Sequence, residues 1–296
     1  MVFALRAIKI ANAPEDQHRA WALWLLLPRM LLATVSKSER EQSGLELLRE
    51  RFRQFWAGEW KPLLANAVAV PRRRGSGGNP SPAARLRHVL DLIKMGELSR
   101  ARSRLAGSVL APLSEATLAS LREQRHSAGE GRLSEETLSF VPDQQVVLDR
   151  NLLTQNVRGA SRGSAHGASG HRFEHFRLLL EDRTQTSFAE FADVAEKFAR
   201  ADIPESIVRA FRIGNLTALA KAQAGVRGIC AGDCFRRIVA RTTVQQHAGE
   251  IERKTAPFEF ALSTRAGADA AALFCRTRLA EDPDLVAIAL DGIGAF

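Results

Sequence analysis

The sequence predicts an α+β protein that is mostly helical. Apolar residues recur at helical intervals through much of the chain, which favours packed helices over sheet. Two short β-prone segments separated by a glycine-containing turn favour one hairpin, and the continuous apolar run 285–290 is typical of a strand buried on both faces. With 296 residues and 45% apolar content, the chain has ample material for a buried core.

The N-terminal part, residues 1–70, is predicted to be helical. Between residues 14 and 64 the large apolar residues recur with charged residues between them, which predicts two or three helices. Residues 71–82 have no apolar spacing and are rich in Gly, Pro and Ser, so we expect a solvated basic linker there. This linker contains the consecutive arginines Arg72, Arg73 and Arg74.

Residues 83–121 are predicted to form short helices. Two of them would be joined at Gly96, and a third would begin at Ser114, whose hydroxyl can accept hydrogen bonds from the first free amides of a helix. Residues 122–140 are polar and contain two glycines, which predicts a second, weaker linker.

The remaining residues, 141–296, carry the clearest local signals. Ser187 and Glu190 have the spacing of a capping box, and the helix that follows should end near Arg200. Pro204 suits the first turn of another helix, which we expect to run through Phe211. Residues 216–221 and 226–230 would be the two arms of the hairpin, and the strand at 285–290 would carry Asp291 at its end.

The charge of the chain favours a polyanionic partner. Its formal net charge is +9, and the excess comes mainly from arginine, whose guanidinium group binds phosphate bidentately and stacks on bases. The alternative is that arginine is frequent only because the gene is rich in G and C. Composition alone leaves both interpretations open.

Cysteine usage and hydropathy exclude several classes. Three cysteines, Cys230, Cys234 and Cys275, are too few for a disulfide framework and indicate a reducing compartment, nuclear or cytoplasmic. A zinc set that adds His247 fits no common spacing, so we expect the cysteines to be small buried hydrophobes. The longest apolar run, 20–27, is too short to cross a membrane, and we expect neither membrane insertion nor secretion.

One group of residues suggests chemistry. Lys221 and Arg227 lie on opposite arms of the predicted hairpin, Arg236 and Arg237 lie on the next helix, and Asp291 ends the predicted strand. Cations neutralise phosphate oxygens and a carboxylate holds Mg²⁺, which are the two requirements of a metal-bound triphosphate. Each residue also has an ordinary interpretation, because hairpin cations are usually solvated and an Asp before Gly292 is usually a turn residue.

The order of the sequence blocks strengthens this interpretation. Five blocks occur in order: 163–170 followed by Glu174-His175-Phe176, then 216–221, then 225–229 with Arg236-Arg237, then 261–267, then 291–296. Together they resemble the reverse transcriptase of non-long-terminal-repeat (LINE-type) retrotransposons, which are mobile elements. The resemblance is strong over the second half of the chain and looser over residues 14–121, which are similar to the arginine-rich helical region that precedes the polymerase core.

The resemblance implies a role for each matched residue. Lys221 and Arg227 match the fingers residues that contact the triphosphate of an incoming deoxynucleotide, and Asp291 matches the first metal-binding aspartate of the palm, a ligand of Mg²⁺. Phe296 matches the aromatic gate that excludes a ribose 2′-hydroxyl, and loop 163–170 matches the segment that leans on the template. The residues expected to contact RNA template or single-stranded DNA are Arg72, Arg73, Arg74, Arg162, Arg236 and Arg237.

The chain also departs from the family pattern. His166 and Ala168 stand where prolines are usual, and Ala224 stands where a second glycine is common. The chain ends at Phe296, before the family's next aspartate, its paired-aspartate motif and its thumb, so residues 141–296 would be incomplete fingers with the start of a palm. We therefore expect an N-terminal fragment; the alternatives are a non-catalytic arginine-rich nucleic-acid-binding protein and a translated pseudogene remnant.

The purified chain is predicted not to extend a primer on an RNA template with Mg²⁺ and deoxynucleotides. Two-metal phosphoryl transfer needs carboxylates from two strands, and these residues offer one such strand. Template-dependent incorporation above a heat-killed control would show that other residues form the site.

Overall fold

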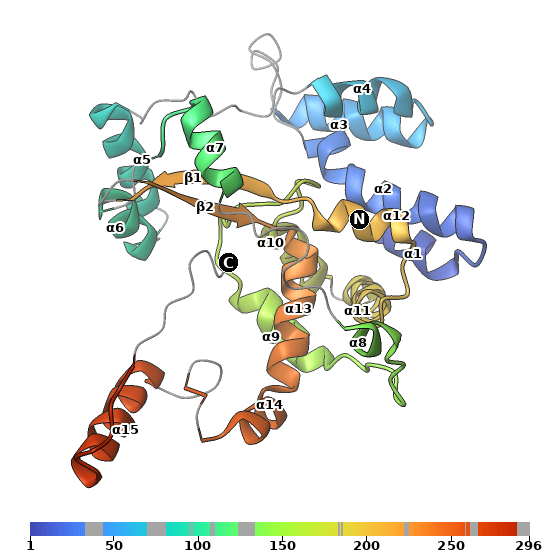
Figure 1. Cartoon of the computed structure of the whole chain (residues 1–296). Helices are drawn as coiled ribbons and strands as arrows, with labels where there is room; N and C mark the ends of the chain where they lie inside the picture. Colours follow the sequence, from blue (N-terminus) through green and yellow to red (C-terminus); the bar gives the residue numbers. More distant parts are fainter. Residues whose placement is uncertain are drawn as a thin grey trace.

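The computed structural model describes residues 1–32, 44–69, 81–94, 96, 98–106, 110–123, 134–182, 184, 186–221, 225–257, 259–260 and 266–288 (Figure 1). This part of the chain is mostly helical, with a two-stranded antiparallel sheet and a short extension of it, so the predicted α+β class is confirmed.

The N-terminal region is helical, as predicted. The helices expected between residues 14 and 64 are present, and one more precedes them. The region contains α1 (Val2–Ile10), α2 (Pro14–Leu32), α3 (Gly44–Trp56) and α4 (Trp60–Ala69). α2 begins with Pro14 followed by two acidic residues, an order that suits the positive end of the helix dipole.

The middle region also follows the prediction in its helices. Gly96 has φ +75° between the first two of them, and Ser114 Oγ accepts a hydrogen bond from the Thr117 amide at 3.2 Å. The elements are α5 (Pro82–Lys94), α6 (Leu98–Ala106), α7 (Glu115–Glu123) and α8 (Glu135–Ser139), the last of which falls inside the expected linker 122–140. Arg72, Arg73 and Arg74 lie outside the described residues.

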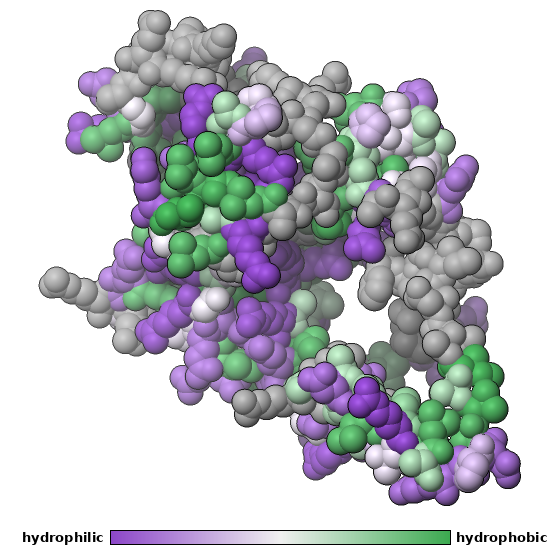
Figure 2. Space-filling model, turned by 90° about the vertical axis from the view of Figure 1, so that its left-hand side faces the viewer, coloured by the Kyte–Doolittle hydropathy of each residue, from purple (hydrophilic) through white to green (hydrophobic). Residues whose placement is uncertain are grey.

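Helices α5 and α6 form a pair with a small core of its own. Val89, Leu92 and Ala101 are buried between them, whereas Leu86 and Leu90 on α5 remain about half exposed. Figure 2 shows apolar side chains gathered over this pair, in the upper left part of the view. The apolar face of the pair is therefore only partly buried.

The C-terminal region contains the hairpin and most of the long helices. Its elements are α9 (Arg150–Gly159), α10 (Phe173–Arg177), the 3-10 helix η2 (Leu178–Leu180), α11 (Thr186–Ala199), α12 (Glu205–Arg212), β1 (Asn215–Ala220), β2 (Val226–Ala231), α13 (Cys234–Gln246), α14 (Ala248–Thr255) and α15 (Gly267–Glu281). α11 ends and α12 begins where the sequence predicted.

The predicted capping box at the start of α11 is wrong. The helix begins at Thr186, and Ser187 directs its hydroxyl to the Asp182 carboxylate at 2.6 Å, which also accepts the Ser187 amide at 3.1 Å. Glu190 instead pairs with Lys9 of α1 at 2.7 Å. A carboxylate four residues before the helix therefore caps it, and Glu190 is free to hold α1.

The predicted buried strand at 285–290 is also wrong over its described part. Residues 285–288 form no strand, and Val286 and Ile288 are 81% and 77% exposed. No described segment pairs with them, so the backbone groups of this run have no sheet to join. Residues 289–296, which include Asp291 and Phe296, lie outside the described residues.

The main core is an aromatic cluster centred on Phe235 of α13. Its ring centroid lies 5.3 Å from that of Phe198, 5.5 Å from that of Trp24 and 5.6 Å from that of Phe191. Trp24 comes from α2, and α1 and α2 pack against α11 and α12 (Figure 1). The N-terminal helices and the region after residue 141 therefore share one core.

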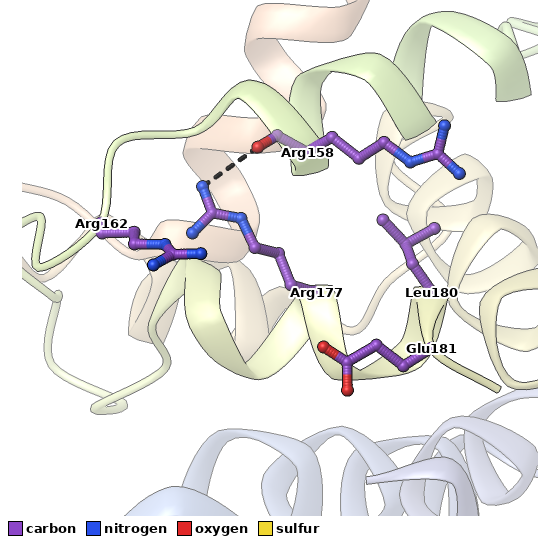
Figure 3. Close-up of a pocket in the computed structure, with 5 residues that line it drawn as sticks. All are labelled: Arg158, Arg162, Arg177, Leu180 and Glu181. Atoms are coloured by element: carbon purple, nitrogen blue, oxygen red, sulfur yellow. Dashed lines mark hydrogen bonds between the residues drawn. The ribbon is translucent and has the colours of Figure 1, made fainter.

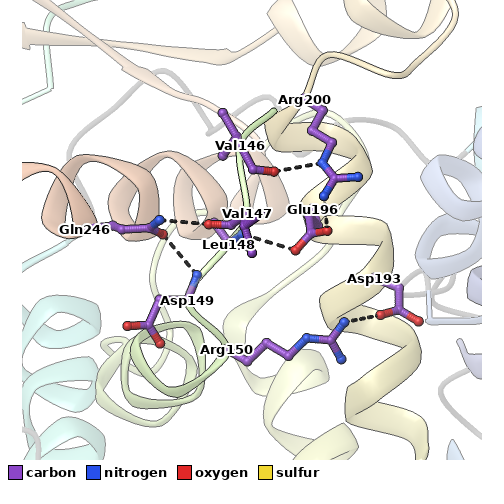
Figure 4. A network of polar contacts seen from close by, with 9 residues as sticks. All are labelled: Val146, Val147, Leu148, Asp149, Arg150, Asp193, Glu196, Arg200 and Gln246. Atoms are coloured by element: carbon purple, nitrogen blue, oxygen red, sulfur yellow. Dashed lines mark hydrogen bonds and ion pairs between the residues drawn. The ribbon is translucent and has the colours of Figure 1, made fainter. Parts of the chain in front are cut away.

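The extended segment 146–149 ties this core together from outside (Figure 4). The Leu148 amide donates to Glu196 of α11 at 3.1 Å, and the Asp149 amide donates to Gln246 of α13 at 3.0 Å. Asp149 also caps α9 by accepting the Asn151 amide at 2.8 Å. Side chains thus satisfy the backbone of a segment that belongs to no sheet.

His171 is a fully buried titratable group in the core. Its ring stacks on Trp24 with a centroid distance of 4.3 Å, and its Nε2 lies 2.9 Å from the Trp24 carbonyl oxygen. Burial lowers the pKa of His171 from 6.5 to about 3, because the charged imidazolium would lose its hydration. The folded protein therefore holds this ring neutral.

The stability of the protein is predicted to fall with acid in a way that depends on His171. Below pH 6.5 the His171 ring binds a proton in the unfolded chain, whereas in the folded protein the ring stays neutral until the pH falls to about 3. Stability is therefore complete above this window and falls as the pH drops through it, by up to about 1.4 kcal/mol per pH unit. His171→Gln should flatten the pH dependence of the urea unfolding free energy by this amount, whereas His247→Gln, at an exposed position, should not. Equal slopes in the two variants would contradict this account.

Candidate phosphate-binding site

The predicted hairpin is present with its expected arms. β1 and β2 pair antiparallel from Asn215↔Ala231 to Ala220↔Val226. The Lys221 amide donates to the Gly225 carbonyl oxygen at 3.0 Å, and Gly225 has φ +96°, a conformation that favours glycine. This hydrogen bond continues the strand register, which sets the direction of each side chain.

The register places the two predicted triphosphate-binding residues on one face. Arg227 is paired with Leu219, and Lys221 follows Leu219 by two residues, so the alternation of strand side chains directs both cations to the same side. Both residues are exposed. Lys221 and Arg227 therefore lie on one exposed face, and among the described residues neither forms an ion pair with a carboxylate.

Helix α7 covers the opposite face of the hairpin (Figure 1). A Cβ added to Gly228, which points to that side, would lie 3.0 Å from Leu121 of α7. Beside β1, the Ala111 amide donates to the Ala218 carbonyl oxygen at 3.0 Å, so residues 110–111 extend one edge of the sheet. The hairpin is thus supported from behind, and its cationic face points to solvent.

The base of the hairpin is fastened to loop 163–170. Asn215 Nδ2 donates to the His166 carbonyl oxygen at 2.8 Å. A Cβ at Gly167 would lie 2.5 Å from the backbone nitrogen of Asp233, a separation that no real side chain tolerates. The loop therefore lies directly against the turn between β2 and α13, and only glycine fits at position 167.

Asp233 joins these segments. Its carboxylate accepts the Phe235 amide at 2.9 Å, which caps α13, and it also accepts the hydroxyl of Ser169. Burial raises the pKa of Asp233, and the two hydrogen bonds oppose that rise. Sequence analysis missed this role, although an Asp directly before a helical segment is a recognised cap signal.

The arginines at the start of α13 are partly committed to the fold. Arg236 Nη1 donates to the Phe211 carbonyl oxygen at 3.3 Å. Arg237 Nη1 donates to the Ala165 carbonyl oxygen at 2.9 Å, and its guanidinium carbon lies 5.2 Å from the centroid of the Phe173 ring. Both side chains remain exposed, so they combine a positioning contact with an open surface.

The other predicted site residues are divided by the structure. Arg162 follows α9 and lines a pocket with Arg158 and Arg177 (Figure 3). Asp291 and Phe296 lie outside the described residues, and within the described part no three His, Cys, Asp or Glu side chains gather to hold a metal ion. Lys221 and Arg227 thus lie at the turn end of the hairpin, and Arg236 and Arg237 lie at the start of α13, the helix that follows β2.

The cysteines do not behave as a set. Cys234 is buried, as expected, with its thiol 3.8 Å from the Ala165 carbonyl oxygen, and burial raises its pKa to about 11. Cys230 and Cys275 are exposed, so their predicted burial is wrong. Cys230 is exposed because it lies on β2, the outer strand of the hairpin.

Comparison with known proteins identified no relative of this chain. No family model, curated protein or solved structure matches the chain. Among the described residues, no helix is both long and apolar enough to cross a lipid bilayer.

Gly167→Ala is predicted to destabilise the protein by about 1 to 3 kcal/mol, because its Cβ would overlap the Asp233 backbone and force the loop away from α13. Gly159→Ala is the matched control, since an added Cβ there meets nothing within 4 Å. In urea unfolding the control should be neutral or slightly stabilising. A Gly167→Ala protein as stable as the control would refute the tight docking of the loop.

Proposed function

We propose that this chain forms the nucleotide-binding fingers region of an RNA-directed DNA polymerase of the LINE type. The observation that carries the proposal is the placement of Lys221 and Arg227 on one exposed hairpin face, whose base is fastened to loop 163–170. The resemblance assigns these segments to triphosphate binding and template contact. The contact between the base of the hairpin and the loop supports that assignment.

The hairpin face suits a triphosphate on physical grounds. Arginine offers a planar fork that binds two oxygens at once, and lysine adds a compact charge that follows a neighbouring oxygen. The hydrogen bond between Lys221 and Gly225 and the covering helix α7 hold the strand register, so the backbone that carries the two cations is already ordered before a ligand binds. Less order must then be gained on binding.

The proposal also assigns residues that would contact the nucleic-acid strand and the Mg²⁺ ion. Arg236 and Arg237 are exposed, Arg237 contacts loop 163–170, and both would contact the backbone of RNA template or single-stranded DNA. Asp291 would bind Mg²⁺, which supplies further neutralisation of the triphosphate, and Phe296 would exclude a ribose 2′-hydroxyl. A non-catalytic arginine-rich nucleic-acid-binding protein would use the same arginines but would not need the Lys221 and Arg227 pair.

Deoxynucleotide binding is predicted to depend on both hairpin cations. Lys221→Ala and Arg227→Ala should each weaken the binding of a deoxynucleoside triphosphate by about 1.5 to 3 kcal/mol, because each removes one charge-assisted contact. Calorimetric titration of the full chain measures the loss.

Lys254→Ala is the matched control. Lys254 is exposed on α14 and pairs with Glu250 at 3.1 Å, so its removal changes the net charge equally but leaves the hairpin intact. Losses of the same size in all three variants would mean that the triphosphate responds only to total charge. That result would favour the non-catalytic alternative.

A further inference from the structure

A second cationic site, a pocket, lies at the C-terminal end of α9 and does not include the hairpin. The pocket has a volume of about 350 Å³ and is lined by Arg158, Arg162, Arg177, Leu180 and Glu181 (Figure 3). The picture shows the guanidinium groups of Arg162 and Arg177 near each other on one side, with the Glu181 carboxylate below the opening. The lining residues include three arginines and one glutamate, so the lining carries an excess of positive charge.

Arg177 is held rigidly in this pocket. Its Nε donates to the Val157 carbonyl oxygen at 3.2 Å, and its Nη2 donates to the carbonyl oxygens of Arg158 and Ala160. These bonds satisfy the C-terminal end of α9 and fix the guanidinium plane. Its Nη1 is enclosed and has no hydrogen-bond partner among the described residues. The guanidinium groups that a bound anion can reach are those of the exposed residues Arg158 and Arg162.

Arg158 supplies charge that the protein itself does not neutralise. Among the described residues no carboxylate lies within ion-pair distance of Arg158, whereas Arg150, on the same helix, pairs with Asp193. The two arginines of α9 therefore differ. Arg150 is neutralised by Asp193, whereas Arg158, which lines the pocket, is available to an external anion.

We propose that the pocket bounded by Arg158, Arg162 and Arg177 binds a phosphate group. Its volume is at the lower end of the range of ligand pockets, which suits one phosphate with an attached sugar. The phosphate belongs either to the backbone of a single-stranded nucleic acid or to a free phosphate compound. The first source rests on the proposed function, because the strand would be the one that passes the fingers.

The first test uses a variant of the full chain in which two arginines of the pocket are replaced together. The double variant Arg158→Gln/Arg162→Gln removes two charges and leaves Arg177 to cap α9. Its affinity for a fluorescent uridine oligonucleotide, measured by anisotropy, should be about tenfold weaker at moderate salt, and the dependence of affinity on salt should become shallower. Glu181→Gln should strengthen binding about two- to threefold, because it removes the repelling carboxylate.

Matched variants separate the pocket from total charge. The double variant Arg150→Gln/Arg209→Gln also removes two positive charges, but outside the pocket. Glu205 pairs with Arg209 at 3.2 Å, and Glu205→Gln makes the same charge change as Glu181→Gln. Inorganic phosphate, titrated by calorimetry, forms the second arm. A loss for the oligonucleotide supports a nucleic-acid source, and a loss for inorganic phosphate alone supports a free phosphate compound.

The proposal is overturned if Arg158→Gln/Arg162→Gln binds both probes as Arg150→Gln/Arg209→Gln does, or if Glu181→Gln and Glu205→Gln have equal effects. Deoxynucleotide titration of the same proteins keeps the two proposals distinguishable. The double variant Arg158→Gln/Arg162→Gln should keep the part of deoxynucleotide binding that Lys221→Ala and Arg227→Ala remove, because the pocket does not include the hairpin. If the wild-type chain binds no deoxynucleotide while the pocket effects persist, the proposed function fails and the phosphate site stands.

Discussion

The close approach of loop 163–170 to the start of α13 is the constraint on which the rest of the fold depends. Gly167 lies where any side chain would overlap the Asp233 backbone, and Ser169 donates to the Asp233 carboxylate. Asp233 caps α13, and two residues later Phe235 enters the aromatic core. One buried carboxylate therefore joins the loop, the end of the hairpin and the core, and a burial penalty is offset by the hydrogen bonds it accepts.

Arginine has three distinct roles in this protein, which explains why net charge alone predicts little. Some arginines pair with carboxylates, as Arg150 does with Asp193. Others satisfy helix C-termini, as Arg177 does at α9 and Arg85 does at α6, where its Nε donates to the Arg104 carbonyl oxygen at 2.9 Å. A third group, with Arg227 and Arg158, faces solvent near other cations. Only this third group is available to a polyanion in full.

Local patterns in the sequence predicted most elements, because a helix or a tight hairpin is determined by residues close in the chain. The hairpin and the cap at Ser114 are examples. The errors arose where distant residues decide. Glu190 fitted a capping box, yet it pairs with Lys9, and the run 285–288 fitted a buried strand, yet no described segment pairs with it. For the same reason the shared core of the N-terminal helices and α13 was not predictable. Within the candidate site, the sequence identified Lys221 and Arg227, but only the strand register shows that they share a face. The role of Asp233 could be seen only in the folded structure.

Hydrogen–deuterium exchange with and without a saturating deoxynucleoside triphosphate tests the central claim, that the cationic hairpin face is the nucleotide site. On the proposed function, a bound triphosphate would contact Lys221 and Arg227 and should slow local opening of the hairpin. We expect protection concentrated in 215–231, with the outlying helix α15 (Gly267–Glu281) unchanged. Protection that is absent from the hairpin, or equal in α15, would contradict the account.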